Sequence, residues 1–254
     1  MSKDLFHKRD EGDPLSNLRE SFSIPEGVVY LNGNSLGPLQ NKVKQRLKEV
    51  IDLEWGEDLI TSWNKHGWMD LPEKVGEKIA PIIGASRGQV VCCDSISINL
   101  FKLLASAMQL RPSRTKILSQ LDNFPTDLYV AAGLGQILGK SKCTLELRSP
   151  KDLVAAMNEE VAVLMLSHVN FRDGSVHDVA DLTRIAHEKD ILVLWDLAHS
   201  AGVLSITVDE WDVDFAVGCG YKYLNGGPGA PSGVFIHEKP VSYTHLTLPT
   251  KRIV

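Results

Sequence analysis

The sequence predicts an α/β protein with a largely parallel sheet, and three observations lead to this fold class. Short apolar runs of strand length alternate with amphipathic helical patterns along most of the 254 residues. Most of these runs are nearly continuous, as expected of strands that helices cover on both faces. The composition, 43% hydrophobic and 23% charged residues, is that of a globular protein and excludes a disordered chain or a coiled coil.

The elements follow from the apolar patterns in chain order. The predicted strands are Lys116–Ser119, Thr144–Leu147, Val161–Ser167, Ile191–Asp196, Asp214–Cys219 and Gly233–His237. Helical periodicity covers Pro38–Trp55, Ser97–Leu110 and Val179–Lys189, the second of which is stopped by Pro112. Alternation of this kind indicates a parallel sheet, in which ligands bind beyond the C-terminal ends of the strands. We therefore looked for site residues at those ends.

Charge and cysteine usage narrow the class of protein. The 27 Lys and Arg residues against 32 Asp and Glu residues give a net charge of −5, which is unlike a nucleic-acid-binding protein. No apolar run approaches the roughly 18 residues that span a membrane, and the first residues lack the apolar segment of a secretory signal. The four cysteines form no CxxC pair, which is typical of a reduced compartment. We expect a cytoplasmic protein that binds neither nucleic acid nor membranes.

Two predicted strands end in residues able to do chemistry. Asp196 ends one strand, and His199 follows three residues later. Tyr221 and Lys222 follow another strand and precede a Gly-Pro-Gly turn. A partly desolvated lysine loses its proton more readily and can form a Schiff base. The alternatives are a capping carboxylate with a core histidine, and a surface lysine beside a turn.

Two helix starts could hold an anion. The segment Ser95–Asn99 opens a helix, so its free N–H groups and hydroxyls could bind a phosphate. The segment Phe124–Asp127 opens another helix and offers an aromatic face, a hydroxyl and a carboxylate. A serine at such a position is more often only an N-cap, so each segment alone is a weak signal.

Two other patterns do not carry a function. The glycines of Gly133–Gly139 resemble a dinucleotide-binding fingerprint, but the third is one position late and the run lies within a helical pattern. Four residues could suggest a metal site: His168, Asp173, His177 and Asp178. Asp173 and Gly174 form a turn signal, and the spacing matches no zinc motif, so we expect no metal.

Five segments together resemble the kynureninase family of pyridoxal-phosphate (PLP) enzymes, in the class V branch of the aspartate aminotransferase fold. They are Leu31–Gly37, Ser97–Leu100, Phe124–Asp127, Asp196–His199 and Tyr221–Gly229. The resemblance runs from about Leu18 to about Pro240. It implies that Lys222 forms the Schiff base and that Asp196 pairs with the pyridinium nitrogen. The other implied cofactor contacts are Ile96, Ser97, Phe124, Pro125, Thr126, Asp127, Ser167, His199 and Tyr221. Ser35 and Trp68 resemble substrate-side positions.

The resemblance also implies an activity. The family hydrolyses the Cβ–Cγ bond of L-kynurenine or 3-hydroxykynurenine to anthranilate or 3-hydroxyanthranilate and L-alanine, in tryptophan catabolism and NAD biosynthesis. Freed Lys222 would move the Cα proton, Tyr221 would be a proton shuttle, and the full-length protein would be a homodimer. The alternatives are another class V enzyme, such as a cysteine desulfurase, and a non-catalytic cofactor-binding fragment. The former is weakened because Tyr221, not histidine, precedes Lys222, and no cysteine follows Cys219.

The expected organisation is an N-terminal arm (residues 1–30), an incomplete PLP-binding large domain (31–240) and a tail (241–254). Family members continue into a C-terminal small domain whose arginine binds the substrate carboxylate, and we find no such segment. The run Val241–Thr250 instead matches the translation of a transposase mosaic end joined to a sequencing adapter. We therefore expect the tail not to be native and the 254-residue chain to be inactive.

Overall fold

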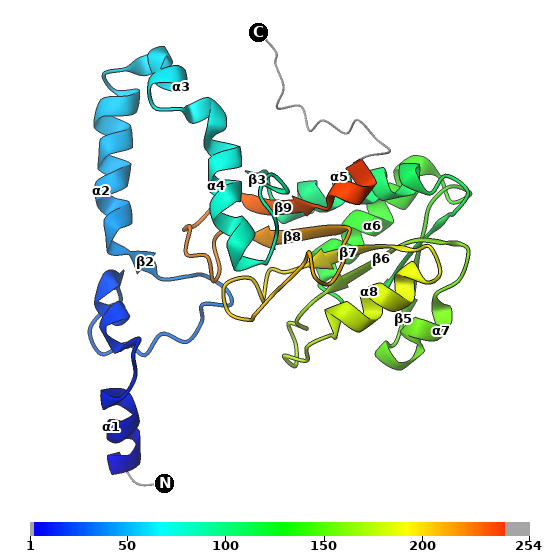
Figure 1. The fold of residues 1–254 in the computed structure, drawn as a ribbon, viewed down its shortest axis with the longest axis horizontal. Coiled ribbons are helices and arrows are strands. Elements are labelled where there is room, and N and C mark those ends of the chain that lie inside the picture. Colours follow the sequence, from blue (N-terminus) through cyan, green and yellow to red (C-terminus); the bar gives the residue numbers. More distant parts are fainter. Residues whose placement is uncertain (1–2, 242–254) are drawn as a thin grey trace.

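The computed structural model describes residues 3–241 and contains one seven-stranded sheet (Figure 1). Its strands are β3 (Val90–Cys93), β4 (Lys116–Gln120), β5 (Thr144–Arg148), β6 (Val161–Ser167), β7 (Leu192–Asp196), β8 (Phe215–Cys219) and β9 (Ser232–Ile236). They lie in the order β3-β9-β8-β7-β6-β4-β5. The pairs from β5 to β8 are parallel, whereas β9 runs antiparallel to both β8 and β3. The predicted, largely parallel α/β fold is confirmed.

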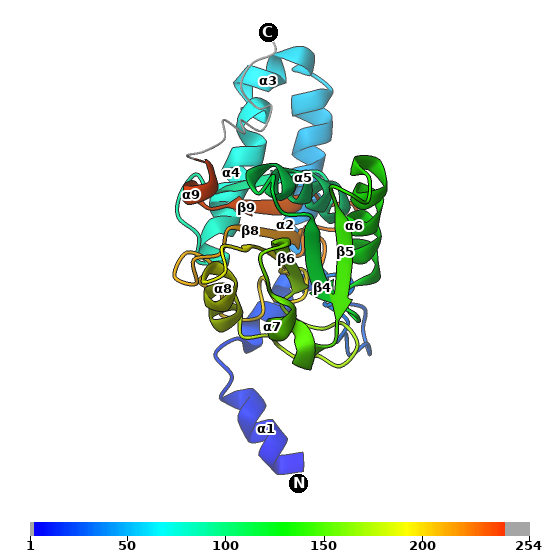
Figure 2. The same ribbon diagram turned by 90° about the vertical axis from the view of Figure 1, so that its right-hand side faces the viewer.

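Helices cover both faces of this sheet (Figure 2). One face packs against α5 (Ile96–Leu110) and α6 (Pro125–Leu138), the other against α4 (Leu71–Ile79), α7 (Leu153–Ala156) and α8 (Val179–His187). Strand β6 is buried at every position. Val163 and Met165 pack in the core on the α5 and α6 side of the sheet, whereas Leu164 and Leu166 pack in the core on the other side. This alternation is what the two-residue period of a strand requires. A continuous apolar run is therefore what a central strand needs here.

The N-terminal elements lie beside the seven-stranded sheet and its covering helices (Figure 1). They are α1 (Lys3–Glu11), the 3₁₀ segment Ser16–Ser21, β1 (Phe22–Ser23), β2 (Leu39–Gln40), α2 (Asn41–Glu49) and α3 (Ser62–Lys65). The helix predicted over Pro38–Trp55 was wrong at both ends. Leu39–Gln40 pairs with Phe22–Ser23 as a strand, and the last turn, Val50–Trp55, is a π-helix. Periodicity could not reveal this because the pairing partner lies outside the window that it samples.

Other boundaries differ by one or two residues. Helix α5 starts at Ile96, because Ser95 is its extended N-cap and its hydroxyl accepts from Ile98 N. Helix α8 ends at His187 rather than Lys189. Strand β9 runs one residue earlier than predicted. Strand β3 was not predicted; it is only four residues long, with Val90 buried and the other three residues half-buried.

The run Gly133–Gly139 lies in and just after α6, which confirms that it is not a dinucleotide-binding loop. Gly139, with φ of +89°, ends the helix. Gly133 has open space where a Cβ would stand. By contrast, a Cβ on Gly76 of α4 would lie 2.0 Å from Val90 O, so α4 packs backbone to backbone on β3.

The predicted tail lies almost wholly outside the described residues. The last described element is α9 (Glu238–Val241), so the non-native origin of residues 241–254 and the domain boundaries at 30 and 240 stay predictions. Within residues 3–241, no helix has both the length and the apolarity to cross a membrane.

The two glycines give a matched test of helix packing. We expect Gly76→Ala to lower the free energy of unfolding by about 1–3 kcal/mol, because the methyl group overlaps the β3 backbone. Gly133→Ala should raise it by about 0.5–1 kcal/mol, since alanine favours a helix and meets no neighbour. Urea unfolding followed by tryptophan fluorescence measures both changes. Equal effects of the two substitutions would contradict the packing of α4 on β3.

Candidate active site

A cavity of 170 Å³ lies at the C-terminal edge of the sheet, between the starts of α5 and α6 and the ends of β7 and β8. Its lining includes predicted site residues from four segments of the chain: Ile96, Ser97, Phe124, Thr126, Asp127, Asp196, Tyr221 and Lys222. The remaining lining residues are Ser95, Ala198, Cys219, Ala230 and Ser232. The structure therefore brings most of the predicted cofactor contacts together around one space.

Lys222 is a buried side chain, not a surface lysine beside a turn. Only 8% of it is exposed, and its Nζ lies 2.8 Å from His199 Nε2. Nζ also lies 5.7 Å from the centre of the Phe124 ring and 5.9 Å from that of Tyr221. Burial, with the Lys222 charge, lowers the pKa of His199 to about 4. The imidazole is therefore neutral at pH 7, and Nε2 can accept a hydrogen bond from the Lys222 ammonium.

Two buried carboxylates, Asp127 and Asp196, line the same cavity. Asp196 Oδ1 accepts a hydrogen bond from Ala198 N at 2.8 Å, but neither Asp127 oxygen has a hydrogen-bond partner. Burial raises the pKa of both groups, and the Asp196 charge raises that of Asp127 further. Such a pair favours a nearby cationic N–H group, which would restore the charged form of the carboxylates.

Two helix N-termini meet at the cavity. Helix α5 starts after Ser95, and α6 starts at Pro125 with no side-chain cap from Phe124. The first N–H groups of a helix lack partners within the helix and carry partial positive charge, which favours an anion. The hydroxyl-bearing residues Ser97 and Thr126 also line this space. A phosphate group fits here.

A second cavity, of 560 Å³, shares Phe124, Tyr221 and Lys222 with the first. It is further lined by Asn34, Ser35, Val169, Asn170, Phe171, Gly174, His199 and Tyr223. Aromatic rings and amide groups thus surround the open side of Lys222, and this lining includes Ser35, which the family resemblance implies on the substrate side. This space suits a small molecule that has both an aromatic ring and polar groups.

Three other predicted residues lie less directly at the site. Ser167 pairs with Asp196 across β6 and β7, and its buried Oγ has no hydrogen-bond partner. Pro125 is the first residue of α6 and does not line the cavity. Trp68 is not brought to the site in this chain: its Nε1 donates to Glu54 Oε2 at 2.7 Å, in the segment between α3 and α4.

Sequence reasoning missed several lining residues. Asn170 and Phe171 follow the end of β6, so the search of strand ends would have found them had it covered this strand. Tyr223 lies next to Lys222 in the sequence but was not singled out. Ala230 and Ser232 gave no signal, since they reach the cavity only because β9 returns antiparallel to β8.

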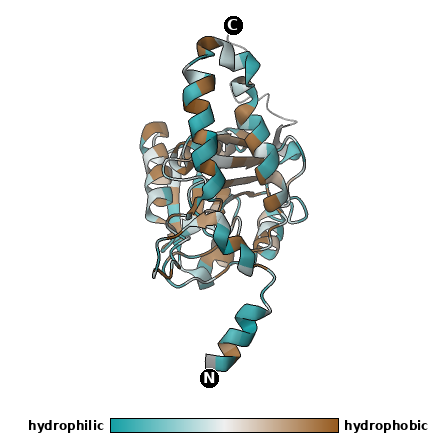
Figure 3. Cartoon of the chain, turned by 90° about the vertical axis from the view of Figure 1, so that its left-hand side faces the viewer, coloured by the Kyte–Doolittle hydropathy of each residue, from teal (hydrophilic) through white to brown (hydrophobic). Residues whose placement is uncertain are grey.

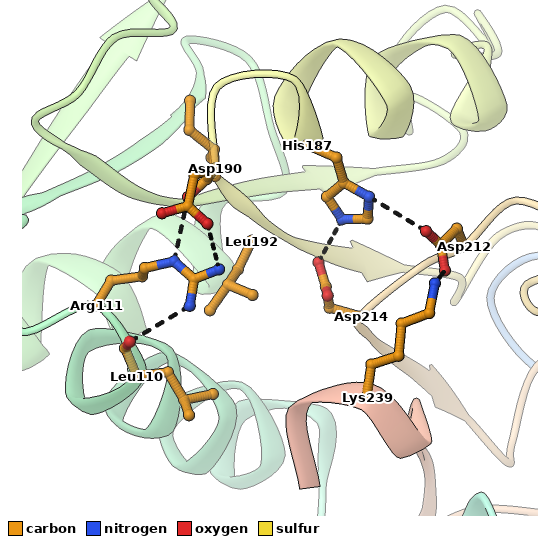
Figure 4. Close-up of a pocket in the computed structure, with 9 residues that line it drawn as sticks. Leu110, Arg111, His187, Asp190, Leu192, Asp212, Asp214 and Lys239 are labelled. Carbon is orange, nitrogen blue, oxygen red and sulfur yellow. Dashed lines mark hydrogen bonds and ion pairs between the residues drawn. The ribbon is translucent and has the colours of Figure 1, made fainter. Parts of the chain in front are cut away.

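A larger cavity, of 570 Å³, lies at the opposite edge of the sheet (Figure 4). Its charged groups pair with one another. Arg111 binds Asp190 at 2.8 Å, and His187 lies 2.8 Å from Asp214, whose hydrogen bond raises the pKa of the imidazole. These pairs tie α5 and α8 to the N-terminal ends of the strands, so we assign this cavity a structural role. Among residues 3–241, no cluster of His, Cys, Asp and Glu is arranged to hold a metal ion.

Comparison with known proteins gives the family. Residues 67–237 match the family model "Aminotransferase class-V". Kynureninase of Burkholderia pseudomallei (strain 1106a) is 47% identical over 234 residues, which are 91% of this chain and 56% of that protein. The chain thus spans about half the length of the relatives that it matches.

Solved structures agree on the fold. The apo cysteine desulfurase of Thermococcus onnurineus NA1 is 21% identical, with a TM-score of 0.70 over 88% of this chain and 57% of its own. A C-DES mutant with glycine covalently linked to its PLP cofactor is 16% identical, with a TM-score of 0.69 over 88% of this chain and 60% of its own. At these identities the match concerns the fold alone. With the family model and the kynureninase homology, it shows that the chain belongs to the class V aminotransferase family.

Proposed function

We propose that this chain is the cofactor-binding part of a PLP-dependent kynureninase. One observation carries the proposal: a buried lysine stands beside a pair of buried carboxylates and two helix N-termini, in a homologue of kynureninases. Membership of the class V family indicates pyridoxal phosphate as the cofactor. The substrate would be L-kynurenine or its 3-hydroxy derivative, and the products anthranilate or its 3-hydroxy derivative and L-alanine.

The residues present fit PLP. The phosphate would lie at the starts of α5 and α6, near Ser97 and Thr126. The orphaned carboxylate of Asp127 and that of Asp196 suit a protonated ring nitrogen. Lys222 Nζ would hold the cofactor covalently. When bound, PLP supplies an electron sink for bonds to the substrate α-carbon.

The chain's own groups then have distinct tasks. Lys222 Nζ would move the proton at the substrate α-carbon, and neutral His199 orients it from 2.8 Å. Burial raises the pKa of Tyr221, so its hydroxyl keeps its proton at neutral pH and can donate it. Asp196 would keep a proton on the ring nitrogen, and Phe124 would lie against the ring. The second cavity, lined by Phe171 and Tyr223, would take the aryl group.

The partner proposed is a second copy of the chain. Helix α2 and the π-helical turn Val50–Trp55 that follows it expose the apolar side chains of Leu47, Ile51 and Trp55, at 54%, 54% and 66%. Figure 3 shows hydrophobic stretches alternating with hydrophilic ones along this helix. Among the described elements, α2 packs chiefly against its own continuation and β2. An apolar helix face of this kind indicates a protein interface. A homodimer would cover it; the cytoplasmic location stays a prediction.

The covalent link is tested by reductive trapping. We expect borohydride to fix PLP on Lys222 in the complete gene product, and Lys222→Ala to abolish the trapped peptide. Lys140→Ala, which removes an exposed lysine, is the matched control and should trap like the wild type. Peptide mapping by mass spectrometry reads the result. PLP trapped on a different lysine would refute the assignment.

The role of Asp196 is tested by Asp196→Asn. The amide fills the same space but cannot carry the negative charge that keeps a ring nitrogen protonated. Turnover should therefore fall on the order of 100-fold, while the affinity for PLP changes by less than about tenfold. Steady-state kinetics and PLP titration of the apo-protein measure both. Near-normal turnover would place the ring-nitrogen partner elsewhere, with Asp127 the next candidate.

The activity itself is tested on two proteins side by side. We expect the complete gene product to release anthranilate and alanine from L-kynurenine, and no sulfide from cysteine. The 254-residue chain should release neither, because we propose that the substrate carboxylate is bound by an arginine outside these residues, and loss of such a contact costs several kcal/mol.

Two outcomes would contradict this proposal. Sulfide release without anthranilate would favour a desulfurase. A soluble 254-residue chain that hydrolyses kynurenine would show that these residues suffice for catalysis and that the proposed arginine is not needed.

A further inference from the structure

At Gly37, the N-terminal part of the chain contacts the turn Gly220–Gly226, which carries Lys222 and is called the lysine turn below. The Gly37 N–H donates to Tyr221 O at 2.8 Å, directly before Lys222. The Tyr30 hydroxyl holds the same loop by donating to Leu36 O at 2.7 Å. Among residues 4–50, Gly37 alone is buried. Gly37 is therefore the one buried residue of a segment whose other residues are exposed or half-buried.

The contact leaves no room for a side chain. A Cβ on Gly37 would lie 2.2 Å from Lys222 O and 2.9 Å from Asn225 Cα, whereas real Cβ atoms essentially never come within 3.0 Å of another atom. Its φ is not in the left-handed region, so close approach, not turn geometry, requires glycine. Gly33 in the same loop differs: its Cβ would lie 3.4 Å from the Tyr223 ring, an ordinary contact.

The turn that Gly37 covers is itself tightly held. Asn225 N donates to Lys222 O at 3.0 Å, and Asn225 has a φ of +56°. Gly226 N donates to Gly220 O at 2.8 Å across the base of the turn. The Lys222 carbonyl is thus fixed from inside by Asn225 and covered from outside by Gly37. The backbone position of Lys222 determines where Nζ stands relative to His199.

We propose that Gly37 is a positioning residue for Lys222. By packing directly on the Lys222 carbonyl, it fixes the backbone from which Nζ reaches the cofactor and the substrate. The inference rests on the proposed function, in which Lys222 is the reacting amine. A misplacement of about 1 Å at a reacting group can cost on the order of 100-fold in rate. A single methyl group at Gly37 forces a movement of that kind.

The test compares Gly37→Ala with Gly33→Ala in the complete gene product. We expect Gly37→Ala to lower kcat by about tenfold or more, because the displaced turn moves Lys222 Nζ away from the reacting atoms. Independently of turnover, the rate at which PLP added to the apo-protein becomes trappable by borohydride on Lys222 should fall. Gly33→Ala, whose methyl group would touch only the Tyr223 ring, should keep the wild-type rate of PLP trapping on Lys222.

A second variant covers the case in which Gly37→Ala does not fold. Tyr30→Phe removes one hydrogen bond that holds the loop and leaves the packing intact, so it should slow trapping on Lys222 about two- to tenfold. The inference is overturned if Gly37→Ala behaves like Gly33→Ala, or, where Gly37→Ala is insoluble, if Tyr30→Phe traps at the wild-type rate. A wild-type protein that traps no PLP on Lys222 would instead refute the proposed function.

Discussion

The burial of one lysine is the constraint on which the rest of the site depends. Removing an ammonium group from water costs several kcal/mol unless other groups compensate. Here His199 Nε2 accepts from Lys222, the carboxylates of Asp127 and Asp196 lie nearby, and the faces of two aromatic rings add cation–π attraction. The carboxylates in turn need a positive charge, because their own burial disfavours ionisation. The lysine and the acid pair therefore stabilise each other's charged forms, and an incoming cationic ring nitrogen would complete the balance.

The topology explains why this balance can be built at one edge. Parallel strands β6 and β7 end side by side, which sets Ser167 next to Asp196. Strand β8 also ends there, but the chain returns directly through antiparallel β9 rather than through a helical crossover. The lysine turn thus lies between two hydrogen-bonded strands, and Ser232 Oγ donates to Gly218 O to close its base. A lysine on a free crossover loop would have no such restraint on both sides.

The sequence allowed six of the seven strands of the main sheet to be predicted and candidate residues to be placed at their ends, because both depend on local pattern. Buried strands such as β6 are continuous apolar runs; Asp196 is the last residue of β7, and Lys222 lies three residues after the end of β8. Contacts between distant segments gave no local signal. The pairing of Leu39–Gln40 with Phe22–Ser23 and the position of Trp68 against Glu54 both depend on partners far along the chain. The role of Gly37 is of the same kind, since its need for glycine arises from Lys222 and Asn225.

These long-range contacts also connect the catalytic edge with the exposed N-terminal helices. Helix α2 begins four residues after Gly37, and a helix as short as nine residues is marginal in water without tertiary packing. Within the described chain, the start of this segment is fixed by Gly37 on the lysine turn, while the apolar side chains of Leu47 and Trp55 stay exposed. Covering those side chains would stabilise the helix and thereby restrain the loop that packs on Lys222. The surface that we propose for a second copy and the proposed catalytic lysine are thus joined by one short stretch of backbone.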